Sequence, residues 1–404
     1  MRSDYREGMD FRRFWLAETV SGFGTYITTI ALQVLVVITL GGTALDVGLL
    51  NAARWLPYLL LGLVVGALVD RRRRKPILVG TDLGRGILLG AIPLLWLFQV
   101  LTLPVLLVVV GGIGLLTLLN DSASQSFLPR LVPRTGLLQA NARLDQSAAV
   151  AQTSGPLVAG GLVALFGAPV AVLVDAVSYF FSAIVMAGIR VVEPAPSTER
   201  LHLRRDIAEG LRWVYRHPTL TPTAITTHVW FLFNSMLTTA FVPFVLLSLN
   251  LSAFELSISL AAAGVAGLLG AFLSTRVGTR WGVGPVVIAG YVVMVFGWAI
   301  IALVPNGVFT VTLLALGQGL YGFALGLQNA NEMAFRQSIT PDALQGRTNT
   351  TIRSINRAAI VIGAPLGGLL ADAIGYRPTI WIGIAGFVSV AIALALSPFR
   401  RVRL

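Results

Sequence analysis

The chain has 404 residues, of which 55% are hydrophobic and only 12% are charged. Soluble domains carry about 25% charged residues, so this composition indicates an integral membrane protein. The net charge of +12 would suggest a nucleic-acid binder in a soluble chain, but here the uneven distribution of arginine among the loops explains it. Cysteine is absent, which excludes disulfides and thiolate metal sites.

Apolar segments long enough to cross a bilayer recur along the whole chain. The first follows Arg2, Arg6, Arg12 and Arg13 and is too long for a cleavable signal, so we expect it to be retained. We predict an all-α membrane protein of about twelve transmembrane helices, near 14–40, 47–69, 77–98, 104–127, 138–166, 169–190, 220–248, 253–275, 284–304, 307–334, 347–374 and 376–397.

Polar stripes at helical spacing run along the spans near 14–40 and 307–334. Polar side chains at membrane depth face the protein interior or a water-filled cavity, although hydrogen bonding between helices would explain the same stripes. Trp230 and Phe231 add aromatic side chains, and an aromatic lining with few fixed charges suits bulky amphiphilic substrates. The candidate cavity residues are Tyr26, Gln33, Trp230, Asn234, Gln318, Tyr321, Gln328 and Glu332.

Five consecutive cations, Arg71–Lys75, separate the second apolar segment from the third. Each charge would cost several kcal/mol in hydrocarbon, so we expect a tight loop at one membrane face. The other arginine-rich connections fall on the same side, and Arg377 is the only Arg or Lys in the connections of the opposite side. The positive-inside rule then places both termini in the cytoplasm.

The two halves of the chain repeat each other. Pro156 is echoed by Pro365 and Asn120 by Asn329, each 209 residues later, and such repeats favour a substrate site at their interface. The expected domains are a six-helix bundle at 1–190, a cytoplasmic linker at 191–218 and a second six-helix bundle at 219–404. In the linker, Ile207, Leu211 and Val214 recur at i, i+4 and i+7, which predicts an amphipathic surface helix.

Several kinds of chemistry are missing. Lys75 is the only lysine and Pro76 follows it, so a G-K-[ST] phosphate loop cannot form. His202, His217 and His228 are scattered, without metal-ligand spacing, and no G-x-S-x-G nucleophile motif is present. We therefore predict neither an enzyme nor a bound cofactor or metal.

The basic loop carries a family resemblance. Its residues fit the pattern G-x-L-x-D-R-x-G-R-K found between the second and third helices of major facilitator transporters, which this chain resembles. Arg73 replaces the small residue of that pattern. The matching residues are Gly66, Leu68, Asp70, Arg71, Arg74 and Lys75.

The resemblance implies a cytoplasmic gating motif of Gly66, Asp70, Arg71, Arg74 and Asp121. In the family, the acid lies at the start of the eleventh helix, where the helix dipole favours an anion, and the later arginine pairs with an acid on the fourth helix. Here these contacts would involve Asp70 and the pair Arg74–Asp121, which would latch the two halves together. The alternative is that the loop only fixes the topology.

Two further segments narrow the resemblance. Gly155, Pro156 and Gly160 resemble the G-P-x-x-G-G signature of facilitator antiporters, although close helix packing would also explain them. The segment from Glu209 to Pro218 resembles the linker of the bacterial drug and siderophore exporters, which include macrolide efflux proteins and the enterobactin exporter. This branch implies a monomer in the bacterial inner membrane.

We therefore expect a proton-coupled exporter of small amphiphilic drugs or metabolites that works by alternating access. Glu18 and Asp175 are the preferred proton carriers, and Asp121, Asp145 and Glu332 are the other candidates. Arg54, Arg353 and Arg357 are possible partners of an acid or of an anionic substrate, although the last two would also be explained by snorkelling to the cytoplasm. The alternatives are a dedicated siderophore or metabolite exporter, and a membrane sensor or lipid-handling protein without antiport.

Overall fold

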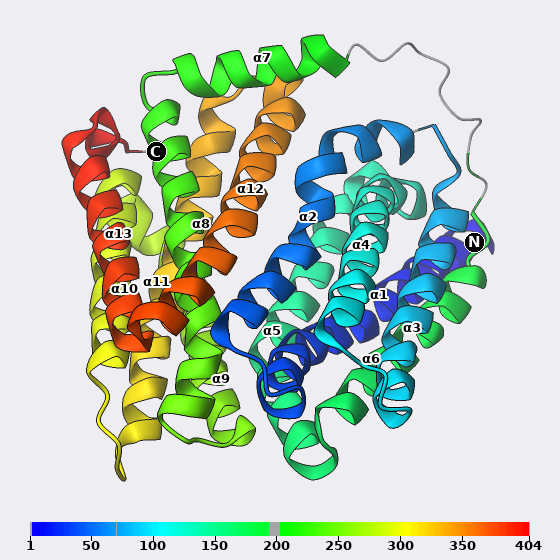
Figure 1. Ribbon diagram of the computed structural model, residues 1–404. Helices are drawn as coiled ribbons and strands as arrows, with labels where there is room; N and C mark the ends of the chain where they lie inside the picture. The colour runs from blue at the N-terminus through cyan, green and yellow to red at the C-terminus, as the bar shows by residue number, and fades with distance from the viewer. Residues whose placement is uncertain (1, 70, 192, 194–202, 404) are drawn as a thin grey trace. The chain divides into compact units, whose positions relative to one another are not determined.

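The computed structural model describes residues 2–69, 71–191, 193 and 203–403 (Figure 1). Within them every regular element is a helix. The α-helices are α1 (Arg2–Val34), α2 (Ala44–Val69), α3 (Arg74–Leu97), α4 (Leu103–Leu131), α5 (Leu137–Phe166), α6 (Ala168–Ala187), α7 (Leu203–Arg216), α8 (Leu220–Pro243), α9 (Ala253–Trp281), α10 (Val283–Leu303), α11 (Thr310–Ile339), α12 (Asp342–Ile374) and α13 (Tyr376–Leu396).

Eleven helices of the described chain are long and apolar enough to cross a membrane. Helix α2, with 26 residues, has the length of a twelfth span. The prediction of an all-α membrane protein is confirmed. The first helix starts earlier than the predicted residue 14, because its backbone continues past the apolar run into the segment with Arg12 and Arg13.

The described chain forms two compact units, Met1–Leu40 with Ala53–Leu201, and Gly41–Ala52 with His202–Leu404. In the first unit, α1 packs against α5 and α6, while α3 packs against α4 and α6. In the second, α8 packs against α12 and α13, while α10 packs against α11 and α13. These helices thus contact the equivalents of the same neighbours, which is consistent with the predicted repeat.

The repeat extends to backbone detail. Helix α1 ends in a π turn, η1 (Leu35–Thr39), and α8 ends in a second one, η3 (Phe244–Ser248), 209 residues later. Each turn is followed by one residue in the left-handed region, Gly41 with φ of 64° and Asn250 with φ of 53°. Glycine and asparagine are the residues that adopt this conformation most readily.

The first turns of α2 belong to the second unit. The Asp372 carboxylate of α12 accepts hydrogen bonds from the backbone N–H groups of Ala44, at 3.1 Å, and Leu45, at 2.9 Å. These are donors that the start of a helix leaves unsatisfied. Gly48 lets the backbones approach, because a Cβ there would lie 2.8 Å from the Cα of Pro365.

Large apolar side chains hold each unit together. Phe14, Leu78 and Phe127 are fully buried in the first unit, and Trp298 and Phe387 in the second. Lipid tails are as apolar as these side chains, so close van der Waals packing rather than release of water favours the assembled helices.

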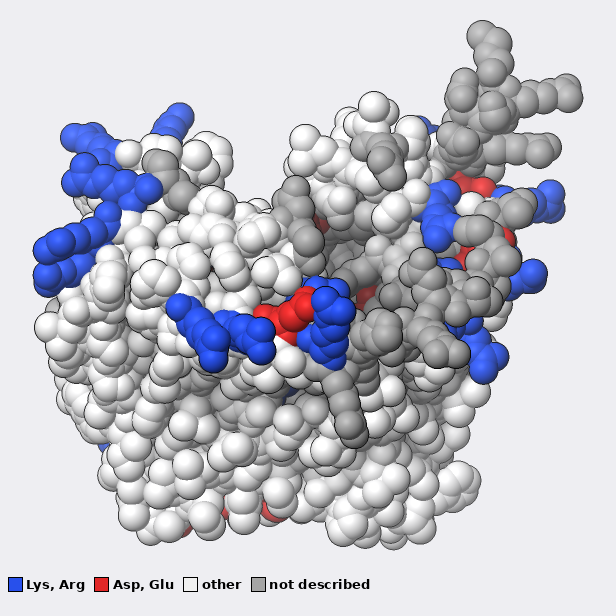
Figure 2. Space-filling model, turned by 90° about the horizontal axis from the view of Figure 1, so that it is seen from above, with Lys and Arg blue, Asp and Glu red and all other residues white. Residues whose placement is uncertain are grey.

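Helix α7, which lies within the predicted linker, packs on α12. Glu209 forms ion pairs with Arg205 on its own helix and with Arg347 of α12. Gly210 allows this approach, since a Cβ there would lie 3.0 Å from the carbonyl oxygen of Arg347. Figure 2 looks onto the face that carries α7, where Lys and Arg side chains gather.

Candidate functional site

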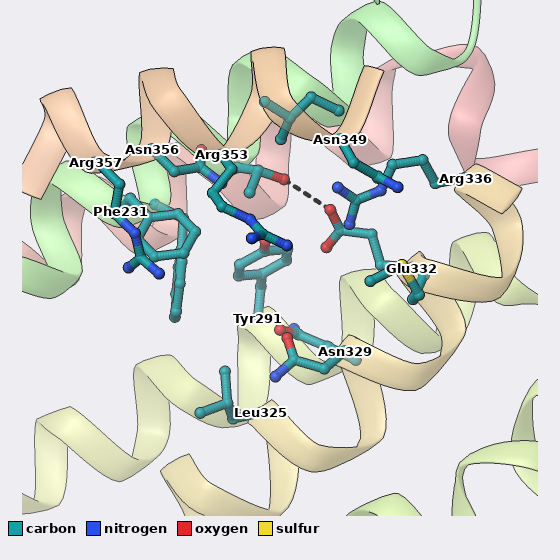
Figure 3. A pocket seen from close by; sticks show the side chains of 15 residues that line it. Phe231, Tyr291, Leu325, Asn329, Glu332, Arg336, Asn349, Arg353, Asn356 and Arg357 are labelled. Carbon is teal, nitrogen blue, oxygen red and sulfur yellow. Dashed lines mark hydrogen bonds between the residues drawn. The ribbon is translucent and has the colours of Figure 1, made fainter. Parts of the chain in front are cut away.

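The second unit contains a cavity of about 360 Å³ between α8, α10, α11 and α12 (Figure 3). Three of its lining residues are cationic, Arg336 on α11 and Arg353 and Arg357 on α12. Figure 3 shows Arg353 and Arg357 pointing from α12 into the same space as Phe231 and Tyr291. We call this cavity the arginine pocket.

One acid, Glu332, faces the three arginines in the lining. The Thr227 hydroxyl donates to Glu332 Oε1 at 2.9 Å, and Arg336 stands one helical turn away on the same helix, at a spacing that favours opposite charges. The sequence expectation of few fixed charges is therefore wrong for this cavity. The reason is that Arg353 and Arg357, one turn apart on α12, turn the same face toward the pocket.

An aromatic and apolar wall completes the pocket. The Trp230 and Phe231 rings meet edge to face with centroids 4.8 Å apart, and Trp230 also stacks on Phe387 at 6.2 Å. Gln328 is fixed by a hydrogen bond from Nε2 to the carbonyl oxygen of Val287 at 2.9 Å. The cavity therefore combines apolar surface with a few oriented polar groups, as small-molecule sites do.

A hydrogen-bonded chain joins the pocket to the linker helix. Asn356 Oδ1 accepts from His228 Nδ1 at 2.6 Å, and His228 Nε2 bonds the Tyr215 hydroxyl of α7 at 2.7 Å. Because the amide oxygen can only accept, Nδ1 carries the proton and Nε2 of the neutral ring accepts from Tyr215. The position of Asn356 in the lining thus depends on α7.

The predicted cavity residues have different surroundings. Trp230, Gln328 and Glu332 line the arginine pocket. Tyr321 donates to Asn234 Oδ1 at 2.8 Å, a hydrogen bond between helices that the alternative reading of the polar stripes anticipated. Gln318, in the same stripe, is buried.

In the first unit, Tyr26 and Gln33 are half-buried on α1. The antiporter-like motif packs directly on this helix, because a Cβ at Gly155 would lie 2.6 Å from the Tyr26 Cβ. Pro156 and Gly160 are buried in the same helix, α5. The motif thus lies where α5 and α1 approach closely, which fits both readings of it.

A buried ion pair in the first unit was not predicted. Asp82 and Arg85, one turn apart on α3, are 2% and 5% exposed and form a salt bridge. Asp82 also accepts from Ser182 Oγ at 2.6 Å and Asn120 Nδ2 at 3.1 Å. Arg85 donates to the Tyr179 hydroxyl at 3.2 Å and lies over its ring. The sequence feature that could have predicted this pair is an acid and a base at i and i+3 within an apolar span.

The preferred proton carriers are held by hydroxyl groups. Ser124 donates to Glu18 Oε1 at 3.1 Å, and Ser178 donates to Asp175 Oδ1 at 2.9 Å. Asp175 is 1% exposed, and Gly24 of α1 makes room for its carboxylate. Among the described residues, neither acid has an ion-pair partner within 4.0 Å.

The basic loop is fixed by an acid that the sequence reading did not consider. The Glu193 carboxylate accepts from the backbone N–H of Arg74 at 2.6 Å and of Lys75 at 2.9 Å, so it caps α3. Asp121 accepts from the Tyr58 hydroxyl at 2.6 Å. The predicted pair of Arg74 with Asp121 stays a prediction.

The rest of the gating motif is only partly described. Asp70 lies outside the described residues, Gly66 falls within α2, and Arg71 is exposed. The latch that the resemblance implies for these residues stays a prediction. In the part of the chain that the structure describes, no cluster of His, Asp and Glu could hold a metal ion.

Solved structures with this fold are transporters. The nucleoside transporter NupG aligns with a TM-score of 0.76 at 12% identity, over 96% of this chain and 98% of that one. A bacterial homologue of the iron transporter ferroportin gives a TM-score of 0.74 at 16% identity, with the same coverage of 96% and 98%. At this identity the likeness shows the fold alone, which is that of the major facilitator transporters.

The family model described as transmembrane secretion effector matches residues 5–403. The chain belongs to this family of major facilitator proteins. It is 27% identical to the multidrug efflux pump Tap of Mycolicibacterium fortuitum, over 90% of this chain and 89% of that protein. It is 23% identical to macrolide efflux protein A of Streptococcus pyogenes, over 98% and 97%.

The enterobactin exporter EntS of Citrobacter koseri is also similar, with 26% identity over 92% of this chain and 85% of that one. The family and these relatives identify the chain as an efflux transporter of the major facilitator type. The resemblance of the linker segment to that of drug and siderophore exporters implied the same.

Proposed function

We propose that the protein exports small amphiphilic compounds from the cytoplasm across the bacterial inner membrane, in exchange for protons and by alternating access. The observation that supports proton coupling is the surroundings of the Glu18 and Asp175 carboxyl groups. Both acids lie in membrane spans and bond hydroxyl groups, with no ion-pair partner among the described residues. An ionisable residue inside a membrane is a candidate for a proton relay.

The arginine pocket supports the substrate part of the proposal. Its volume of about 360 Å³ lies in the range of small-molecule sites, which starts near 300 Å³. Phe231 and Tyr291 offer an apolar wall, while Asn349 and Asn356 offer polar atoms. A compound with one apolar and one polar part would find both kinds of contact there.

Proton release during transport tests the coupling. Purified protein in proteoliposomes is given ethidium, erythromycin or the anion estrone sulfate, and proton movement is followed with a pH-sensitive dye. We expect Glu18→Gln or Asp175→Asn to abolish coupled uphill export while downhill exchange continues. Asp46→Asn, which removes an exposed capping acid at the start of α2, is the matched control and should keep coupling.

Normal coupling in the Glu18→Gln/Asp175→Asn double variant would show that Asp121, Asp145 or Glu332 carries the proton instead. Accumulation that survives collapse of the proton gradient but stops without sodium would refute proton antiport itself.

A further inference from the structure

The charges of the arginine pocket do not balance. Arg336, Arg353 and Arg357 face a single acid, Glu332, in the lining. If Arg336 compensates Glu332, the described lining holds no further acid that could compensate Arg353. Cations at i and i+4 on one helix face repel each other, and in a membrane span they require water or an anion beside them.

The fold does not require these arginines. At the repeat offset of 209 residues, Arg353 corresponds to Leu144 and Arg357 to Ala148. Helix α5 packs against α1 as α12 packs against α8, so the same helix is built in the first unit without either charge. The arginines are a property of this pocket rather than of the architecture.

Their surroundings point to the chemistry of a ligand. Among the described residues, no hydrogen bond or ion pair is recorded for the Arg353 side chain, and Figure 3 shows it pointing into the cavity toward Tyr291. Guanidinium groups recognise carboxylate, phosphate and sulfate oxygens through paired hydrogen bonds. The Phe231 and Tyr291 rings border the same space and offer apolar surface.

We propose that the arginine pocket binds an amphiphilic organic anion, with its oxyanion at Arg353 and Arg357 and its apolar body against Phe231 and Tyr291. This assignment rests on the proposed export function and narrows its substrates to one charge class. It also explains why Glu332 is held by Thr227, at 2.9 Å, since a carboxylate turned toward the arginines would compete with the ligand.

Equilibrium binding to wild-type protein in nanodiscs tests the charge class. Tritiated estrone sulfate and estrone share one apolar skeleton and differ in the oxyanion, and a scintillation proximity assay measures both without transport. We expect the sulfate to bind about tenfold more tightly than estrone, or about 1.4 kcal/mol. Equal affinities, or no binding of the sulfate, would overturn the proposal.

Variants then locate the contact. Arg353→Gln should reduce the affinity for estrone sulfate about tenfold and leave that for estrone unchanged, whereas Arg353→Lys should restore part of the loss. Arg280→Gln, at the exposed end of α9, is the matched control and should bind as the wild type does. Wild-type affinity for the sulfate in the Arg353→Gln/Arg357→Gln double variant would overturn the assignment.

The binding assay and the export assay can fail separately. Export of ethidium by a protein that does not prefer the sulfate would leave the proposed function standing and refute the anion site. Preferential binding of the sulfate without coupled export of the sulfate would refute the transport mechanism while the anion site remains.

Discussion

Asp82 and Arg85 are two buried charges in a membrane span, and they form an ion pair with each other. The pair sits almost out of contact with solvent, and Ser182, Asn120 and Tyr179 form further hydrogen bonds with its two side chains. Removing one member of a buried pair leaves an uncompensated charge, which typically costs about 3–5 kcal/mol. The pair is therefore a local determinant of stability even though an apolar replacement of both residues could be equally stable.

We predict that Arg85→Gln lowers the apparent melting temperature of the detergent-solubilised protein strongly, because it leaves the Asp82 carboxylate unpaired at a cost of about 3–5 kcal/mol. The Asp82→Asn/Arg85→Gln double variant should recover much of the loss, since no charge remains. Size-exclusion chromatography after heating measures both. A double variant less stable than Arg85→Gln alone would contradict this reading.

Residue-level prediction from the sequence succeeded unevenly. Gln328 and Glu332 were selected on polar spacing and Trp230 as an aromatic residue of the next cavity helix, and all three line the arginine pocket. Polar spacing also selected Tyr321, which bonds Asn234 of that helix instead. A polar stripe shows that a helix face avoids lipid, but whether a partner side chain or open space meets that face depends on helices distant in sequence.

At the scale of elements, α7 is held to α12 by charge. The hydrogen bond from Arg205, together with the nearby Arg347 guanidinium, lowers the pKa of Glu209 below its ordinary value. The folded state therefore favours the charged carboxylate. Its contribution to docking is present above the ordinary glutamate pKa of about 4.3 and is lost as the pH falls through the lowered value.

This linkage predicts that α7 loosens in acid. Cysteine is absent from the chain, so a nitroxide on Ala208→Cys reports on this exposed position of α7 alone. Its mobility should be low at neutral pH and should rise below about pH 4. With Glu209→Gln added, mobility should be higher at neutral pH and should change little with acid. Equal pH responses of the two proteins would show that another acid controls the docking.

At this scale the sequence specifies the length of each span but not the local geometry of the helix ends. Apolar length located the spans, because crossing a bilayer demands it. The π turns η1 and η3 left no mark in hydropathy, since a π turn changes only which carbonyl each N–H group reaches. The cap that Glu193 places on α3 was equally hidden, because it joins residues that are 119 and 118 positions apart.

For the whole molecule, the arginine distribution predicts that both termini and α7 are cytoplasmic. Single cysteines test this in intact cells with a maleimide that cannot cross membranes. Val308→Cys, in a connection where Val308 is 94% exposed, should be labelled from outside. Arg212→Cys on α7 should react only after the cells are opened. Labelling of Arg212→Cys in intact cells would reverse the orientation.

The paired π turns carry a record of ancestry. Turns of this kind are rare, yet both units have one 209 residues apart, each followed by a left-handed residue. One origin explains two turns at equivalent positions more simply than two origins, so we infer that the turn is older than the duplication of a six-helix unit. At the same offset, Arg353 and Arg357 of the second unit correspond to Leu144 and Ala148 of the first. The charge of the pocket thus diverged between the copies, while the turn that both inherited did not.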